Sequence, residues 1–365
     1  MEKEDSEIPR KTEGDERVGR DFQGIGRSKM KMKTRRSGKS WDKETKTTTK
    51  KKYWMGCLRA ESDESGNVDL TVDFPGELTE PTHLVVMVNG LIGSSQDWRF
   101  AAKQMLKKYP QDLVVHCSKR NHSTQTFVGV DVMGERLAEE VRSVIKRHPS
   151  LQKISFVGHS LGGLIARGHK QVPLFSGSHA LERLARRMSW CLGKTGKHLF
   201  LADSDGGKRD DGKHLLLIRM VYDSRDLKFI SALRCFKRRI AYANTSFDHL
   251  VGWSTSSIRH HNELPKLQRA PVSEKYPHIV NVEAAVTTSN RKEDRSGTNS
   301  NGFKNLDKEE EMIRELTKLS WERVDVSFRG TLQRFLAHNT IQVKTKMINS
   351  AGADVIQHMV DNFEP

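Results

Sequence analysis

The stretch that decides the fold is KISFVGHSLGGLIARGHKQVP, residues Lys153–Pro173. Its segment Ile154–Val157 is short, β-branched and aromatic, which is typical of a buried strand in a parallel sheet. The next five residues, Gly158–Gly162, fit the pattern G-x-S-x-G, in which small residues flanking a serine allow the backbone to turn sharply. The pattern alone is weak evidence, but here it follows a predicted strand, and Ser160 is the candidate nucleophile.

A helix is predicted directly after this turn, because Leu161, Leu164 and Ile165 recur at helical spacing. Strand, turn and helix together form the setting that a nucleophile elbow requires. The helix is expected to stop after about two turns, since Gly168 and then Pro173 follow it. The alternative left open is a glycine-rich turn with an incidental serine.

The charge is concentrated at the N-terminus of the chain. The 365 residues carry a formal net charge of +16, and much of it lies in Arg27–Lys52, which has few apolar residues and no helical stripe. We expect residues 1–52 to form a disordered basic tail, followed by one α/β domain over residues 53–365. The tail is either a solubilising extension or a tether to an anionic membrane surface. Nucleic-acid binding is not favoured, because no aromatic interleaving or known module accompanies the charge.

The compartment is predicted from targeting signals and cysteines. The N-terminal residues are charged and lack the apolar core of a signal peptide, and no run reaches the roughly 18 apolar residues that span a bilayer. The cysteines form no C-x-x-C pair, which argues against a zinc site or a disulfide framework; they are Cys57, Cys117, Cys191 and Cys235. We therefore expect an intracellular, cytoplasmic protein with no metal and no organic cofactor.

Predicted strands and helices alternate along the domain. Strands are predicted around residues 83–88, 112–116, 154–157, 240–243 and 324–328, and helices around residues 98–107, 132–147, 226–236, 308–319 and 352–363. This alternation predicts an α/β fold with a mostly parallel sheet and helices on both faces. The polar, glycine-containing stretch 289–305 is interpreted as a flexible insertion.

A serine nucleophile needs a histidine to take its proton and a carboxylate to hold that histidine. In a fold of this kind the chain order is serine, acid, histidine. Asp248 is the first acidic residue after the strand 240–243, although an aspartate in a turn is the alternative. Asp223 and Asp226 come earlier, where carboxylates cap helices.

Position along the chain selects the histidine. His338 follows the last predicted strand and precedes the last helix, which is where the base belongs. The other histidines of this region are less suitable, because they adjoin the acid, lie in a polar stretch or fall within the closing helix; they are His249, His260, His261, His278 and His358.

Two backbone N–H groups are needed to stabilise the negative oxygen that forms during acyl transfer. One is expected from Leu161, directly after the serine. The other is expected from the loop Asn89-Gly90-Leu91 after the first core strand, where Leu91 is the candidate donor.

Four segments carry a resemblance to a known family: HLVVMVNGLIGSSQDWRFAA, FVGHSLGGLIAR, RIAYANTSFDHLVGWSTSSIR and FLAHNTIQVKTKMINSAGADVI. They resemble the lipase-like serine esterases of the α/β-hydrolase fold found in plants and fungi, over most of residues 82–363. The resemblance implies hydrolysis of a carboxylic ester, with a lipid or small ester as substrate. It places Ser160, Asp248 and His338 at the family's triad positions.

The chain departs from the family pattern after Arg167. The family continues with a longer helix and a further strand, whereas Arg167 here runs into GHKQVPLFSG. This predicts an internal deletion that removes one interior strand. Leu199–Ala202 and Val172–Phe175 are the local segments that could replace the strand, and Pro173 disfavours the second. The alternative function is therefore a catalytically impaired module that binds lipid or protein, and a nucleic-acid binder is a third reading.

Overall fold

The structure is a computed structural model that describes residues 57–62, 68–73, 80–168, 192–203, 215–225, 227–267, 273–285 and 304–365. The chain divides into the units Met1–Tyr53 and Trp54–Pro365, and every described residue belongs to the second. The predicted basic tail, the segment Val172–Phe175, Asp226 and residues 289–303 of the predicted insertion lie outside the described residues.

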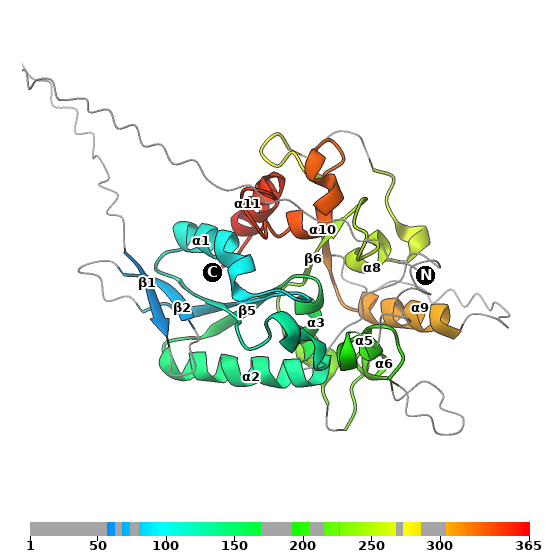
Figure 1. Cartoon of the computed structure of the whole chain (residues 1–365), viewed down its shortest axis with the longest axis horizontal. Helices are drawn as coiled ribbons and strands as arrows, with labels where there is room; N and C mark the ends of the chain where they lie inside the picture. Colours follow the sequence, from blue (N-terminus) through cyan, green and yellow to red (C-terminus); the bar gives the residue numbers. More distant parts are fainter. Residues whose placement is uncertain are drawn as a thin grey trace, which may run out of the picture. The chain divides into compact units, whose positions relative to one another are not determined.

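The first sheet has five strands in the order β1-β2-β4-β3-β5 (Figure 1). The strands are β1 (Cys57–Ser62), β2 (Val68–Asp73), β3 (His83–Val88), β4 (Leu113–Cys117) and β5 (Lys153–Gly158). The pairs β3/β4 and β3/β5 are parallel, while β1/β2 and β2/β4 are antiparallel. Strand β5, which leads into the serine turn, therefore lies at one edge of this sheet.

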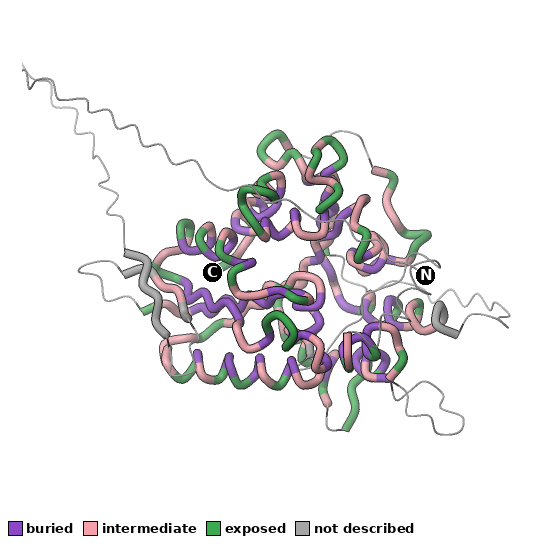
Figure 2. Tube along the Cα trace, in the orientation of Figure 1, coloured by how far each residue is buried: buried purple, intermediate pink, exposed green. Residues whose placement is uncertain are grey.

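Alternating side chains of β3 build two cores on opposite faces of the sheet. Leu84, Val86 and Val88 pack with α2 (Val130–Arg147) and α3 (Leu161–Gly168). The intervening Val85 and Met87 pack with α1 (Arg99–Lys108) and α11 (Ala353–Asp361). Both β3 and β4 are buried along their full length, as the continuous purple of their traces shows (Figure 2). Period-two alternation with both faces covered explains why these strands are mostly apolar, with His83 and His116 as buried exceptions.

The second sheet has three strands in the order β6-β8-β7. The strands are β6 (Ile240–Asn244), β7 (Ile279–Glu283) and β8 (Glu322–Val326). The pair β6/β8 is parallel and β7/β8 is antiparallel. A buried ion pair supports this sheet, because Arg259 donates from Nη1 to Oδ1 of the fully buried Asp325 on β8 at 2.8 Å.

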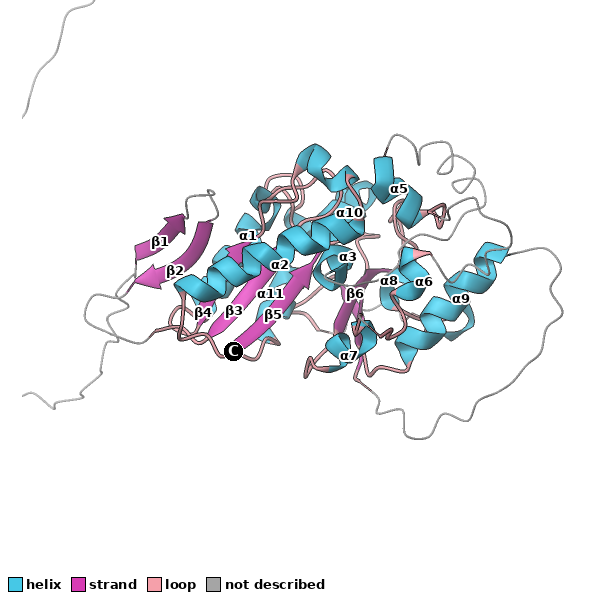
Figure 3. Cartoon of the chain, turned by 90° about the horizontal axis from the view of Figure 1, so that it is seen from below, coloured by secondary structure: helices cyan, strands magenta, loops and turns pink. Residues whose placement is uncertain are grey.

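The prediction of one mostly parallel sheet needs correction. The described strands form two sheets, with three parallel and three antiparallel pairings, so the architecture is a mixed α/β one. Among the described residues, β5 pairs only with β3, and β6 pairs only with β8. Figure 3 shows the two groups of strands separately. The division falls between the strand of the serine and the strand of the acid, as expected if one interior strand is missing.

Leu199–Ala202, one of the two segments considered as a replacement strand, does not form a strand. It comprises the last residue of α5 (Gly193–Leu199) and the turn that follows. Instead, Ile230 and Leu233 of α7 (Phe229–Arg234) pack against the apolar clusters of both sheets. Phe156 of β5 meets the Phe236 ring edge-on, with 5.9 Å between centroids. Apolar side chains thus join the two sheets where backbone hydrogen bonds were expected.

The remaining short elements cover the sheets or carry loops. They are α6 (Leu216–Arg219), α8 (Trp253–Ser257), α9 (Lys304–Thr317), α10 (Ala337–Thr340), and the 3-10 turns η1 (Ser95–Trp98), η2 (Ser123–Phe127), η3 (His261–Glu263), η4 (Leu332–Leu336) and η5 (Ser350–Gly352). Within the described ranges, no helix is both long and apolar enough to cross a bilayer.

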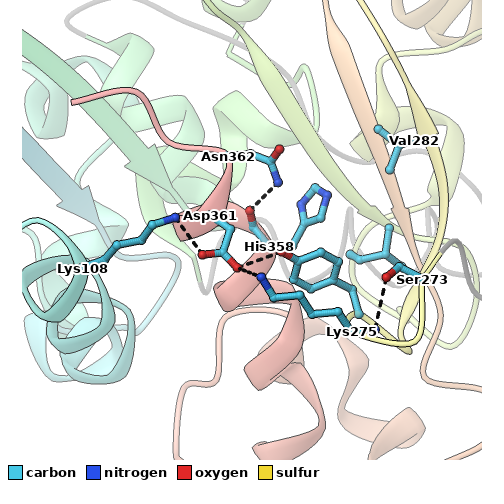
Figure 4. Close-up of a pocket in the computed structure, with 9 residues that line it drawn as sticks. Lys108, Ser273, Lys275, Val282, His358, Asp361 and Asn362 are labelled. Carbon is cyan, nitrogen blue, oxygen red and sulfur yellow. Dashed lines mark hydrogen bonds and ion pairs between the residues drawn. The ribbon is translucent and has the colours of Figure 1, made fainter. Parts of the chain in front are cut away.

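Helix α11 connects the two sheets at a second place. Its Asp361 accepts from Lys108 Nζ of α1 at 2.8 Å and from Lys275 Nζ, before β7, at 2.7 Å (Figure 4). Tyr276 donates its hydroxyl to the same carboxylate at 2.8 Å. These side chains line a pocket of about 470 Å³. Because its lysines are both paired with Asp361, we interpret this cluster as a structural link.

Candidate active site

The serine turn has the strained geometry that its sequence predicts. Ser160 lies between the end of β5 and the start of α3 and has a φ of +54°, in the left-handed region that non-glycine residues rarely adopt. A Cβ on Gly158 would lie 2.6 Å from the Gly163 backbone nitrogen, and one on Gly162 would lie 2.1 Å from the Val88 carbonyl oxygen. Gly158 therefore allows the start of α3 to fold back closely on the end of β5, and Gly162 allows the turn to pack against β3.

Two adjacent glycines of α3 provide a matched test of this packing. Gly162→Ala should lower the free energy of unfolding by about 1–3 kcal/mol, because the new methyl overlaps the Val88 carbonyl. Gly163→Ala meets no atom within 4 Å and should instead stabilise the helix by about 0.5–1 kcal/mol. Urea unfolding of both variants checks the pair. Equal stability of the two would mean that α3 does not pack against β3 as described.

Asp248 and His338 are brought together although 90 residues separate them. His338 lies in α10, and its Nδ1–H donates to the two carboxylate oxygens of Asp248 at 3.2 and 3.1 Å. Asp248 also accepts from Asn244 Nδ2 at 2.9 Å and from the backbone N–H of Val251 at 2.9 Å. Burial by itself would raise the pKa of Asp248, but these hydrogen bonds, led by that of His338, hold the pKa below its ordinary value. The carboxylate stays charged and fixes the imidazole with Nδ1 protonated.

His159 connects His338 to the serine turn, although the sequence analysis did not single out this residue. The ring of His159 lies 4.6 Å from the His338 ring, centroid to centroid. Burial, and next the neighbouring His338, lower the pKa of His159 to about 3, so His159 is neutral. Its Nε2 therefore carries a hydrogen and donates to the His338 carbonyl oxygen at 2.7 Å. A histidine directly before the serine of the motif was the only signal that could have indicated this bridge between the two sheets.

The serine and the histidine are neighbours without being bonded. In the described part of the chain, the Ser160 hydroxyl makes no hydrogen bond with the His338 imidazole. Such bonds are often long without substrate and shorten when it binds. The structure thus places His338 beside the serine turn, and its Nε2 has no hydrogen-bond partner among the described residues.

The loop after β3 lies against the serine. A Cβ on Gly90 would come within 3.1 Å of Ser160 Cβ, so this glycine allows the close approach. The next N–H groups of the loop are engaged, that of Ile92 by Thr126 Oγ1 at 3.0 Å and that of Gly93 by the Gly90 carbonyl at 3.0 Å. The N–H of Leu91 has no partner among the described residues.

Two further features fit the expected pair of N–H donors. Leu161 is the first residue of α3, and its N–H lies among those that a helix leaves unpaired at its start. The buried Asn89 holds the opposite loop, because its Nδ2 donates to the carbonyl oxygens of Asn121 at 2.8 Å and Gly90 at 3.1 Å. Sequence reasoning considered only the backbone of Asn89 and missed this role of its side chain.

The histidines set aside on sequence grounds make other contacts. His358 bonds through Nδ1 with the Tyr242 hydroxyl at 2.9 Å, and His278 contacts Asp354 at 2.9 Å. His260 pairs with Glu310. Asp223 accepts from the backbone N–H of Ser231 at 3.1 Å and so caps α7, as expected. No cluster of three or more metal-ligating side chains occurs among the residues the structure describes.

Part of the chain matches a known protein family. Residues 79–169 and 166–258 match the family described as Putative serine esterase (DUF676). The chain belongs to this family. It is 31% identical over 243 residues to "Putative lipase ROG1" of Saccharomyces cerevisiae, covering 57% of this chain and 34% of that protein. It is 28% identical over 222 residues to "Putative lipase C4A8.10" of Schizosaccharomyces pombe, covering 53% of this chain and 28% of that protein. The aligned part is thus about a third of each relative's length.

The family match is divided where the sequence predicts the deletion. Its two segments overlap at residues 166–169, at the end of α3. At that point two nitrogens of Arg167, Nε and Nη2, are buried without a partner among the described residues. Burial lowers the pKa of this guanidinium well below its usual value. An unpaired buried donor is unfavourable, so Arg167 is expected to lower the stability of this end of α3.

Adding the block that the sequence analysis predicts to be deleted should stabilise the protein. Inserting a helix and strand of the kind that the family pattern has after Arg167 would give β5 and β6 a common partner. We expect the midpoint of thermal unfolding to rise by about 10 °C, since each ladder bond contributes about 1 kcal/mol and 1 kcal/mol corresponds to about 2–4 °C. A Gly/Ser insertion of equal length is the control. A melting midpoint no higher than that of the control would show that the two-sheet arrangement is already complete.

Proposed function

We propose that this chain is a serine hydrolase of the α/β-hydrolase fold that cleaves carboxylic esters, with lipid acyl esters as its substrate class. The observation that carries the proposal is the strained Ser160 turn, beside which Asp248 holds the ring of His338. Family membership and the names of the fungal relatives support an ester hydrolase in general. The roles of individual residues and the lipid substrate are part of the proposal.

The proposed reaction begins with attack of Ser160 Oγ on the ester carbonyl carbon. His338 Nε2 takes the serine proton, because Nδ1 is already occupied by the hydrogen bond to Asp248. The developing oxyanion accepts from the N–H groups of Leu91 and Leu161. His338 then gives the proton to the departing alcohol, which leaves an acyl group on Ser160. A water molecule, deprotonated by His338, releases the acid and regenerates the serine. The reaction requires no metal and no organic cofactor.

A second candidate is a catalytically impaired member of the fold that binds lipid or protein. Two observations favour it: the serine and the histidine belong to different sheets, and the Ser160 hydroxyl is not bonded to His338. The interior strand that would hold the two sheets in register is absent from the described residues. If the two sheets do not come close enough for His338 to take the proton of Ser160, the chain is expected to bind its ligand without hydrolysing it.

A panel of esters separates the two candidates. The chain should hydrolyse p-nitrophenyl esters with acyl chains from two to sixteen carbons, and the chain-length profile would define the substrate class. Retention on immobilised lipid without release of p-nitrophenol from any ester would favour the impaired module.

We also propose that the chain is located inside the cell. Cys235 is exposed and free, and the buried Cys117 is also free. Thiols in this state persist in a reducing compartment.

A further inference from the structure

Most of the exposed large apolar side chains in the described part of the chain lie on segments close in sequence to the candidate site residues. Ten large hydrophobic residues are exposed in the described part, and seven of them lie on the loops that carry site residues. These seven are Ile92, Leu250, Leu332, Phe335, Leu336, Met347 and Ile348. Met347 is 93% exposed and Leu332 88% exposed, so neither stabilises the fold by burial. Apolar groups concentrated in this way indicate an interaction surface.

Two neighbouring segments, η4 and the loop before η5, supply most of this surface. Gln333 of η4 donates from Nε2 to Ser350 Oγ at 3.0 Å, and its Oε1 accepts from the Ala351 N–H at 2.7 Å. These bonds hold Leu332 and Met347 on adjoining segments. The Phe335 ring meets Phe247, next to Asp248, with 6.1 Å between centroids. The surface therefore begins beside the candidate acid and histidine.

The charges on these segments have one sign. Residues 327–353 contain four basic side chains and no acidic one. Lys344 pairs with Asp97 at 3.3 Å, but Arg329, Arg334 and Lys346 have no carboxylate partner among the described residues. The Arg334 guanidinium lies 4.8 Å from the centre of the Phe335 ring. Basic groups are thus interleaved with exposed apolar ones.

We propose that this surface docks on an anionic lipid surface. The docking surface comprises Leu332, Phe335, Leu336, Met347 and Ile348, together with Arg329, Arg334 and Lys346. Flexible apolar side chains can enter the boundary between headgroups and acyl chains while the basic groups contact anionic headgroups. An acidic protein would complement the charge but would not require side chains as exposed and unpacked as Met347 and Leu332. Docking would bring α10, with His338, to the lipid.

Binding of the full-length chain to vesicles tests the proposal without any ester hydrolysis. The vesicles are phosphatidylcholine alone and phosphatidylcholine with about a third phosphatidylserine, at low and at high salt. The wild-type chain should bind the anionic vesicles at least tenfold more tightly than the neutral ones, and salt should weaken this binding. The variant L332S/M347S/I348S should bind at least tenfold more weakly, and R329Q/K346Q should lose most of the preference for anionic lipid.

The matched control is the variant I145S/V282S, which removes exposed apolar side chains of α2 and β7, away from the site loops. It should bind vesicles as the wild-type chain does, and thermal melts should show that all variants are folded. Equal vesicle binding by L332S/M347S/I348S and the wild-type chain would overturn the proposal and assign lipid contact to the basic tail, residues 1–52. Failure of the wild-type chain to bind either vesicle would also overturn it and favour a protein partner. Because the readout is binding, the result is independent of whether the chain hydrolyses esters.

Discussion

Replacing Ser160 with alanine should abolish ester hydrolysis and leave the fold intact. The hydroxyl is the attacking atom of the proposed reaction, so its loss should lower kcat by about 10³-fold or more. The side chain contributes little packing, and the melting midpoint should stay within a few degrees of that of the wild-type chain. Initial rates on a short-chain p-nitrophenyl ester, together with a thermal melt, measure both quantities.

The control for this variant is Ser155→Ala on the strand that precedes the turn. Ser155 Oγ bonds with His83 Nε2 at 2.9 Å, away from the reacting atoms, so its loss should leave kcat within a few-fold. Ester hydrolysis by the Ser160 variant within tenfold of the wild-type rate would contradict the serine mechanism.

His338→Ala and Asp248→Asn should each reduce kcat by about 10³–10⁴-fold. The first removes the proton acceptor. The second replaces the carboxylate that holds the His338 Nδ1–H with an amide, which favours the wrong tautomer of the imidazole. Both variants should still bind substrate, so KM should change much less than kcat.

Other histidines serve as controls for these two variants. His249→Ala, directly beside the acid, should leave kcat nearly unchanged. His358→Ala removes the bond between α11 and Tyr242 of β6, and it should affect stability more than turnover. A greater loss of turnover in His358→Ala than in His338→Ala would show that the histidine is misassigned.

The central part of the fold was predictable because its residues are buried on both sides. The strands around residues 83–88 and 112–116 are mostly apolar, and the structure places them as β3 and β4 in the middle of the first sheet. Helix α2 has apolar residues at spacings of three and four, and it packs on one face as that pattern predicts. In these elements, local pattern and tertiary burial point to the same structure.

The edges of the sheets were not predictable in the same way. Strand β7 follows a polar stretch and has an irregular pairing between Ile279 and Asn281, so no clear alternation marks it. A break between β5 and β6 was indicated by comparison with the family pattern after Arg167, but that comparison did not show that the strands would form two separate sheets. Apolar side chains of α7 join the two sheets. This contact depends on packing between segments that are distant in the sequence, so no local pattern predicts it.

The same difference between predictable and unpredictable contacts applies to the candidate site. Chain order was sufficient to select Asp248 and His338, which lie on loops after neighbouring strands of one sheet and are hydrogen-bonded. The relation of His338 to Ser160 depends on how the two sheets meet, and the contact of His159 with the His338 carbonyl is part of that arrangement. Residues on one sheet could therefore be paired from sequence, whereas contacts between the sheets could not.

The central claim is that Ser160 is an activated nucleophile, and covalent labelling with a fluorophosphonate tests it most directly. Only a serine whose proton is taken by a neighbouring base reacts quickly with this probe. We predict that the wild-type chain gains one probe mass, that peptide mapping places it on Ser160, and that His338→Ala slows the labelling by at least about 10²-fold. A wild-type chain that remains unlabelled, or that carries the probe at another residue, would contradict the account.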